Sequence, residues 1–120
     1  MSDWLYLGLY LQAYGLDVWM YDYRGFGESD DFAIVRDQLF HLEFVNDLDA
    51  VAGHVYRKTG KSPALLGISM GTIIVNEYLR IADIPVSKVI FDGYVADPKA
   101  WNEKLADNGK IVTLPESYKN

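Results

Sequence analysis

The pentapeptide Gly67-Ile68-Ser69-Met70-Gly71 decides how the rest of the chain is interpreted. A short apolar run before it predicts a buried strand, and a second apolar run after it predicts a helix. Ser69 would then lie on the sharp turn between the two. This is the Gly-x-Ser-x-Gly arrangement of a nucleophile elbow.

The chemistry of such an elbow depends on its glycines. The residue at the tip is held in a strained backbone conformation, and the closely approaching chain leaves room only for neighbours without a side chain. This strain would direct the hydroxyl of Ser69 outward, while the N–H of Met70 and the positive end of the helix would face a developing oxyanion. We therefore expect Ser69 to be a nucleophile and the backbone N–H of Met70 to form part of an oxyanion hole. The alternative is a structural Gly-Ser turn.

Composition limits the other classes of function. The chain has 120 residues, half of them hydrophobic, which suits a single domain over residues 1–120. A net charge of −6 with no basic run argues against nucleic acid or an anionic membrane surface as a partner. The absence of cysteine excludes disulfides and a thiol nucleophile. The apolar N-terminus is too short, and lacks the basic start, for a signal peptide or a membrane span, so the default expectation is a cytoplasmic location.

The hydrophobic pattern alternates between helices and strands along the chain. This alternation predicts an α/β fold with a parallel sheet and flanking helices. The helix at the N-terminus is apolar on most sides, so we expect it to be mostly buried under another element. The expected helices cover residues 4–14, 44–56 and 70–82, with a further one starting at Asp97-Pro98, and the expected strands cover residues 16–23, 62–68 and 88–92.

The segment Asp22-Tyr23-Arg24-Gly25-Phe26-Gly27-Glu28-Ser29 leaves the first expected strand as a loop. Loops at the carboxyl ends of strands bind ligands in open α/β sheets, so this loop could line the mouth of a pocket. The other interpretation is that Asp22, Arg24 and Glu28 only tie the loop to its neighbours. We favour the second.

The loop at residues 22–29 followed by the pentapeptide at residues 67–71 resembles the middle of an α/β-hydrolase. The most similar branch contains the lysophospholipase-like and serine-aminopeptidase-like hydrolases, and the resemblance runs from about Ser2 to about Trp101. It implies that the full-length parent is a serine hydrolase that cleaves ester, thioester or amide bonds of a small-molecule substrate through an acyl-enzyme at Ser69. It implies no cofactor and no metal.

The resemblance also implies a partial fold. The strands at residues 16–23, 62–68 and 88–92 match the fourth, fifth and sixth strands of an eight-stranded sheet, so the first three and the last two strands would be lacking. The third strand normally lies between the fourth and the fifth, so we expect an unoccupied lane between residues 16–23 and 62–68, and a chain prone to aggregation. The second oxyanion donor would lie before Met1, and the catalytic acid and histidine, in the order Ser–acid–His, beyond Asn120.

Few residues of the chain are candidates for the rest of a catalytic triad. His41 and His54 both precede Ser69, and we expect them to be solvated rather than to act as a base. Asp92 is a weak candidate for the acid, with a loop anchor as its alternative, and Asp97 is better explained as a helix cap. The sequence contains no cluster with the spacing of a metal site. We therefore expect the chain as given to be catalytically incomplete. The alternatives to a hydrolase whose full-length form completes the site are a non-catalytic truncated fragment and a module completed by another chain.

Overall fold

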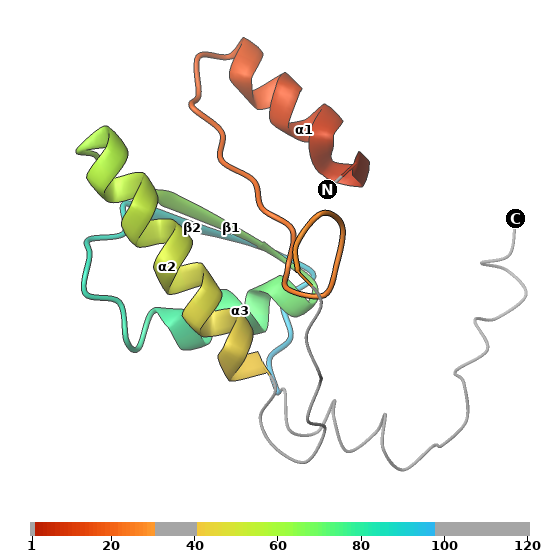
Figure 1. Cartoon of the computed structure of the whole chain (residues 1–120), viewed down its shortest axis with the longest axis vertical. Coiled ribbons are helices and arrows are strands. Elements are labelled where there is room, and N and C mark those ends of the chain that lie inside the picture. Colours follow the sequence, from red (N-terminus) through yellow and green to blue (C-terminus); the bar gives the residue numbers. More distant parts are fainter. Residues whose placement is uncertain (1, 31–40, 98–120) are drawn as a thin grey trace, which may run out of the picture.

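The computed structural model describes residues 2–30 and 41–97. These residues form three helices and a two-stranded parallel sheet, and Figure 1 shows their arrangement. The elements are, in order, α1 (Ser2–Ala13), α2 (His41–Thr59), β1 (Ala64–Ile68), α3 (Met70–Tyr78) and β2 (Lys88–Asp92). The α/β class predicted from the sequence is confirmed.

The core is formed where α2, α3 and β1 meet. The buried apolar side chains of these elements pack as one cluster, comprising Phe44, Val45, Leu48, Ala52, Leu65, Ile74, Val75 and Tyr78. The long helix α2 contributes one apolar side, and its ends carry Glu43 in the first turn and Arg57 and Lys58 in the last. These charges complement the helix dipole, so the sequence itself favours α2.

The sheet is buried on one face only. β1 and β2 pair in parallel, from Ala64 opposite Lys88 to Ile68 opposite Asp92. Along β1, Leu65 and Gly67 are buried, whereas Leu66 is 45% exposed. Ile90, which is paired with Leu66, is 57% exposed. The helices therefore cover the face that carries Leu65, and the face that carries Leu66 lies open.

The predicted strand at residues 16–23 is wrong. No strand is formed there, and the only sheet among the described residues contains β1 and β2. The apolar sequence suits a strand, but a strand needs a hydrogen-bonded neighbour, and none of the described segments pairs with it. Residues 16–23 do not pair with β1, while the unoccupied lane and the tendency to aggregate stay predictions.

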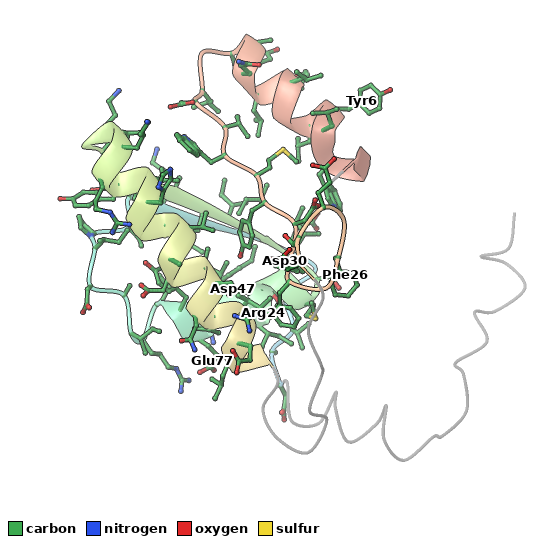
Figure 2. All side chains as sticks on the ribbon, viewed as in Figure 1. Tyr6, Arg24, Phe26, Asp30, Asp47 and Glu77 are labelled. Atoms are coloured by element: carbon green, nitrogen blue, oxygen red, sulfur yellow. The ribbon has the colours of Figure 1, made fainter. Side chains whose placement is uncertain are left out.

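The expectation of a mostly buried N-terminal helix is also wrong. Trp4 is 48% exposed and Tyr6 is 81% exposed, and Figure 2 shows Tyr6 pointing away from the rest of the molecule. Only Gly8 is buried among the helix residues whose side chains are described. A Cβ at Gly8 would lie 2.8 Å from Sδ of Met20, so α1 rests on the segment that follows it. No other described element covers its apolar sides.

The remaining predicted elements differ from the structure mainly in length. The predicted helix at 44–56 extends to both sides in α2, and the predicted strand at 62–68 is shorter in β1. The predicted helix at 70–82 ends at Tyr78, where a hydrogen-bonded turn begins. The strand at 88–92 is confirmed. The helix expected after Asp97 lies outside the described residues.

Candidate active site

Ser69 occupies the turn between β1 and α3 in a strained backbone conformation. Its φ of 52° and ψ of −116° make it the only residue other than glycine with a positive φ in the described part of the chain. This region of φ/ψ space is unfavourable for a residue with a Cβ and costs about 1–3 kcal/mol. Ser69 is exposed. The structure thus places the hydroxyl-bearing residue on a tight bend, as the sequence predicted.

The hydroxyl of Ser69 is not used to cap the helix. A serine at the N-cap usually accepts a hydrogen bond from the second or third helical N–H. Ser69 is the N-cap of α3, yet its side chain makes no such bond. The hydroxyl oxygen therefore stays available for another partner.

Two glycines make room for the turn. A Cβ on Gly67 would lie only 2.7 Å from the carbonyl oxygen of Gly71, a backbone atom that cannot move aside. A Cβ on Gly71 would lie 3.3 Å from the hydroxyl oxygen of Tyr23. The first glycine therefore allows β1 and α3 to approach each other, and the second allows Tyr23 to pack against the start of α3.

Hydrogen bonds hold both backbone groups of Ser69. Its N–H donates to the carbonyl oxygen of Asp92 at 2.8 Å. Its carbonyl oxygen accepts from the N–H of Thr72 at 2.9 Å and from the hydroxyl of Thr72 at 2.7 Å. Thr72 is completely buried. These bonds oppose the strain at the bend, because relaxing φ or ψ would break at least one of them.

Met70 is the first helical residue of α3. The first N–H groups of a helix lack acceptors within the helix. The N–H of Met70 makes no hydrogen bond within residues 2–30 and 41–97. It therefore has the free donor that an oxyanion hole requires, directly after Ser69.

The acid candidate Asp92 lies at the same end of the sheet as Ser69. It is paired with Ile68, the residue before Ser69, and its side chain is exposed. Its backbone carbonyl anchors the N–H of Ser69, which agrees with the anchoring alternative. Its carboxylate makes no hydrogen bond or ion pair with another described group.

No described contact brings His54 to the turn. His54 is exposed on α2, where its ring meets that of Trp19 edge-on at 5.8 Å between centroids. His41 is the first residue of α2. Asp97, the expected helix cap, is exposed and borders residues outside the described range.

The loop after residues 16–23 is tied to α2 and to itself. Arg24 donates from Nε to Oδ2 of Asp47 at 2.7 Å and from Nη1 to Oε2 of Glu43 at 3.0 Å. Figure 2 shows Arg24 reaching across to Asp47. Within the loop, the N–H of Glu28 donates to Oδ2 of Asp22 at 3.1 Å. Asp22 and Arg24 therefore tie the loop to neighbouring groups, as the favoured interpretation expects, whereas Glu28 contributes its backbone.

A hollow of about 460 Å³ lies between this loop and α2. It does not include Ser69. Its walls are formed by Tyr21, Asp22, Arg24, Ser29, Asp30, Asp47, Ala50 and Val51. We do not regard it as the substrate site, because the strained turn lies elsewhere.

Sequence reasoning missed Tyr23 and Thr72. Tyr23 packs on Phe44 at 5.2 Å between ring centroids, and burial raises the pKa of its hydroxyl. Thr72 is a buried polar residue inside the apolar first turn of α3. A threonine directly after the second glycine of the pentapeptide was a usable signal, because an apolar turn rarely buries a hydroxyl without a hydrogen-bonding reason.

The described residues contain no group of three or more His, Asp or Glu side chains that could hold a metal ion. Their helices are each too short or too polar to cross a membrane.

Comparison with known proteins identifies the family of the chain. Residues 4–107 match the family described as "Serine aminopeptidase, S33", which has an α/β-hydrolase fold and supports a hydrolase function. No curated protein and no solved structure matches the chain. Because the match spans most of the sequence, the chain belongs to the serine aminopeptidase S33 family of α/β-hydrolases.

Proposed function

We propose that Ser69 is the nucleophile of a serine hydrolase that cleaves ester, thioester or amide bonds through an acyl-enzyme. The observation that carries this proposal is the backbone of Ser69, with φ of 52° and ψ of −116° at an exposed strand-to-helix turn. A conformation of this cost persists when the surrounding structure enforces it, and such conformations cluster at functional sites. The hydrolase family of the chain supports the same assignment.

The reaction follows from the groups at the turn. Oγ of Ser69 attacks the carbonyl carbon of the substrate, its proton passes to a general base, and the carbonyl oxygen becomes an oxyanion. The free N–H of Met70 and the start of α3 stabilise this negative charge. Collapse of the intermediate expels the alcohol, thiol or amine, which takes up the proton. Water then releases the acid and restores Ser69.

A serine at this position separates the proposal from related chemistries. The dehalogenase and epoxide-hydrolase branches of the fold resemble this arrangement but carry aspartate at the turn. A serine hydroxyl needs a base to react at neutral pH, and His54 makes no described contact with Ser69, because its ring meets that of Trp19. The proposal therefore assigns the base to a histidine of the full-length protein other than His41 and His54, the two that this sequence contains, and the orienting acid to a carboxylate of that protein. Oxyanion contacts alone still accelerate the reaction above its rate in water, but far less than a complete site.

Labelling with a fluorophosphonate tests the proposal. This probe forms a covalent bond with an activated serine hydroxyl. Because the chain does not supply the proposed base, we expect slow but saturable labelling of the wild-type chain and none of Ser69→Ala. Ser87→Ala is the matched control, because Ser87 is also exposed but lies before β2, at the opposite end of the strands. Labelling that persists in Ser69→Ala, or no labelling of a folded wild-type chain, contradicts the proposal. The second result favours a chain without catalytic activity.

A further inference from the structure

We propose that the hydroxyl of Thr72 is a positioning residue for the reaction at Ser69, an inference that rests on the proposed function. The hydrogen bonds of its hydroxyl are to backbone groups, and neither of them involves Oγ of Ser69. It acts on the backbone of Ser69 and on the segment that follows β2. The inference concerns the geometry in which the nucleophile is held.

The hydroxyl of Thr72 joins two parts of the site that lie far apart in the sequence. It donates to the carbonyl oxygen of Ser69 at 2.7 Å and accepts from the N–H of Val95 at 3.1 Å. A hydroxyl has one donor and two acceptor lone pairs, so both bonds form at once. The oxygen lies in a residue with no exposed surface, where competition with water is excluded.

A local explanation accounts for only one of these bonds. Threonine near the start of a helix often bonds a carbonyl three or four residues earlier, without any functional meaning. The bond to Ser69 fits that pattern. The bond from Val95 does not, because Val95 lies 23 residues later and on another segment. Thr72 therefore connects the turn to the chain after β2.

This segment packs directly on the nucleophile turn. Gly93 has a φ of 65°, and a Cβ placed on it would lie 3.7 Å from the backbone nitrogen of Ser69. Asp92, immediately before it, accepts the N–H of Ser69. Val95, two residues after Gly93, is held by Thr72. The segment thus wraps the turn, with Asp92 fixing the N–H side of Ser69 and Thr72 fixing the carbonyl side.

The consequence for the reaction is a fixed ψ at Ser69. Rotation of the peptide after Ser69 would break the bonds to Thr72, and the same rotation would move the N–H of Met70. Since that N–H is the proposed oxyanion donor, its direction depends on the carbonyl of the same peptide unit. The hydroxyl of Thr72 therefore fixes both the strained backbone conformation of Ser69 and the direction of the N–H of Met70.

The test compares the rates at which the full chain and its variants react with a fluorophosphonate. Thr72→Val removes the hydroxyl and keeps the branched shape, and we expect it to react about tenfold more slowly, the loss that corresponds to one hydrogen bond. Thr72→Ser restores the hydroxyl, and we expect a rate near that of the wild type. Ile73→Val is the matched control, because it shortens the buried neighbour without touching a hydrogen bond. The pH dependence of the rate should keep its shape in Thr72→Val, because geometry changes and no titrating group is lost.

Two results would overturn the inference alone. One is a folded Thr72→Val that reacts at the wild-type rate, and the other is an equal loss of rate in Thr72→Val and Ile73→Val. An unreactive wild-type chain overturns the proposed function instead, and the inference with it. Amide hydrogen exchange of Val95 in the wild type does not depend on any variant folding. We expect slow exchange, and exchange at the rate of an unprotected amide overturns the inference.

Discussion

The N–H of Ser69 donates a hydrogen bond of 2.8 Å to the backbone carbonyl of Asp92. This bond continues the parallel pairing of β1 with β2 by one residue, past Ile68 and into the turn. The bend at Ser69 is therefore held by the carboxyl end of the sheet as well as by the start of the helix. Substitutions that change the backbone conformation around Ser69 should accordingly change both the stability of the chain and the reactivity of this site.

Ser69→Gly should be more stable than Ser69→Ala. Glycine adopts a φ of 52° with a ψ of −116° without the steric penalty of a Cβ, whereas alanine keeps it. Glycine therefore removes a strain of about 1–3 kcal/mol. This gain is offset in part, because glycine loses about 0.5–1 kcal/mol more backbone conformational entropy on folding than alanine does. We expect a difference of about 1 kcal/mol in the free energy of unfolding, measured with urea. Equal stabilities would show that the bend carries no strain.

Gly67→Ala should destabilise the chain. The new methyl group would lie 2.7 Å from the carbonyl oxygen of Gly71, so β1 and α3 would have to move apart. We expect a loss of about 1–3 kcal/mol in the free energy of unfolding, together with slower fluorophosphonate labelling. Gly53→Ala, in α2, is the matched control. Its methyl group would meet only the mobile end of Arg57 at 3.1 Å, and alanine favours the helix by about 0.5–1 kcal/mol. A loss of stability as large in Gly53→Ala would refute this explanation.

The ion pairs of Arg24 should contribute unequally. Nε and Nη2 of Arg24 both reach Asp47, whose side chain is 26% exposed, whereas Glu43 is 55% exposed and receives one bond. Bidentate, partly buried pairs are stronger than single exposed ones. Double-mutant cycles with Arg24→Gln should give a coupling of about 1 kcal/mol to Asp47→Asn and below about 0.5 kcal/mol to Glu43→Gln. The reverse order would contradict the geometry.

The raised pKa of the Tyr23 hydroxyl should lower the free energy of unfolding at alkaline pH. Burial raises the pKa of its hydroxyl above the ordinary value of 10.0. Above that value the unfolded chain loses this proton while the folded chain keeps it, so the free energy of unfolding falls as the pH rises. Tyr23→Phe should reduce the slope between pH 10 and 12 by up to about 1.4 kcal/mol per pH unit. Tyr6→Phe is the control, because the side chain of Tyr6 is 81% exposed in the folded chain. An unchanged slope in Tyr23→Phe would show that the hydroxyl is solvated.

The sequence predicted the turn at Ser69 and the strands and helices next to it because their signals are local. Two glycines at a fixed spacing, an apolar strand and an apolar helix specify the bend without reference to distant residues. The pairing of β1 with β2 follows from the same alternation of elements, since parallel neighbours need a helical crossover. Arg24 was expected to act as a tie, and its partners in α2 bear this out.

What the sequence did not predict depends on neighbours. Residues 16–23 have the composition of a strand, yet the state of such a segment is decided by whether another strand pairs with it. The burial of α1 likewise depends on what covers it, which its own apolar pattern does not encode. The bond between Thr72 and Val95 joins residues 23 positions apart, and no pattern within either segment announces it.

The most direct test of the central claim is to locate the covalent adduct after the wild-type chain reacts with a fluorophosphonate. Mass spectrometry of the digested protein should show a single modified position, Ser69, with the exposed Ser87 unmodified. Adducts spread over several serines, or a folded chain that carries none, would contradict the assignment of Ser69 as the nucleophile.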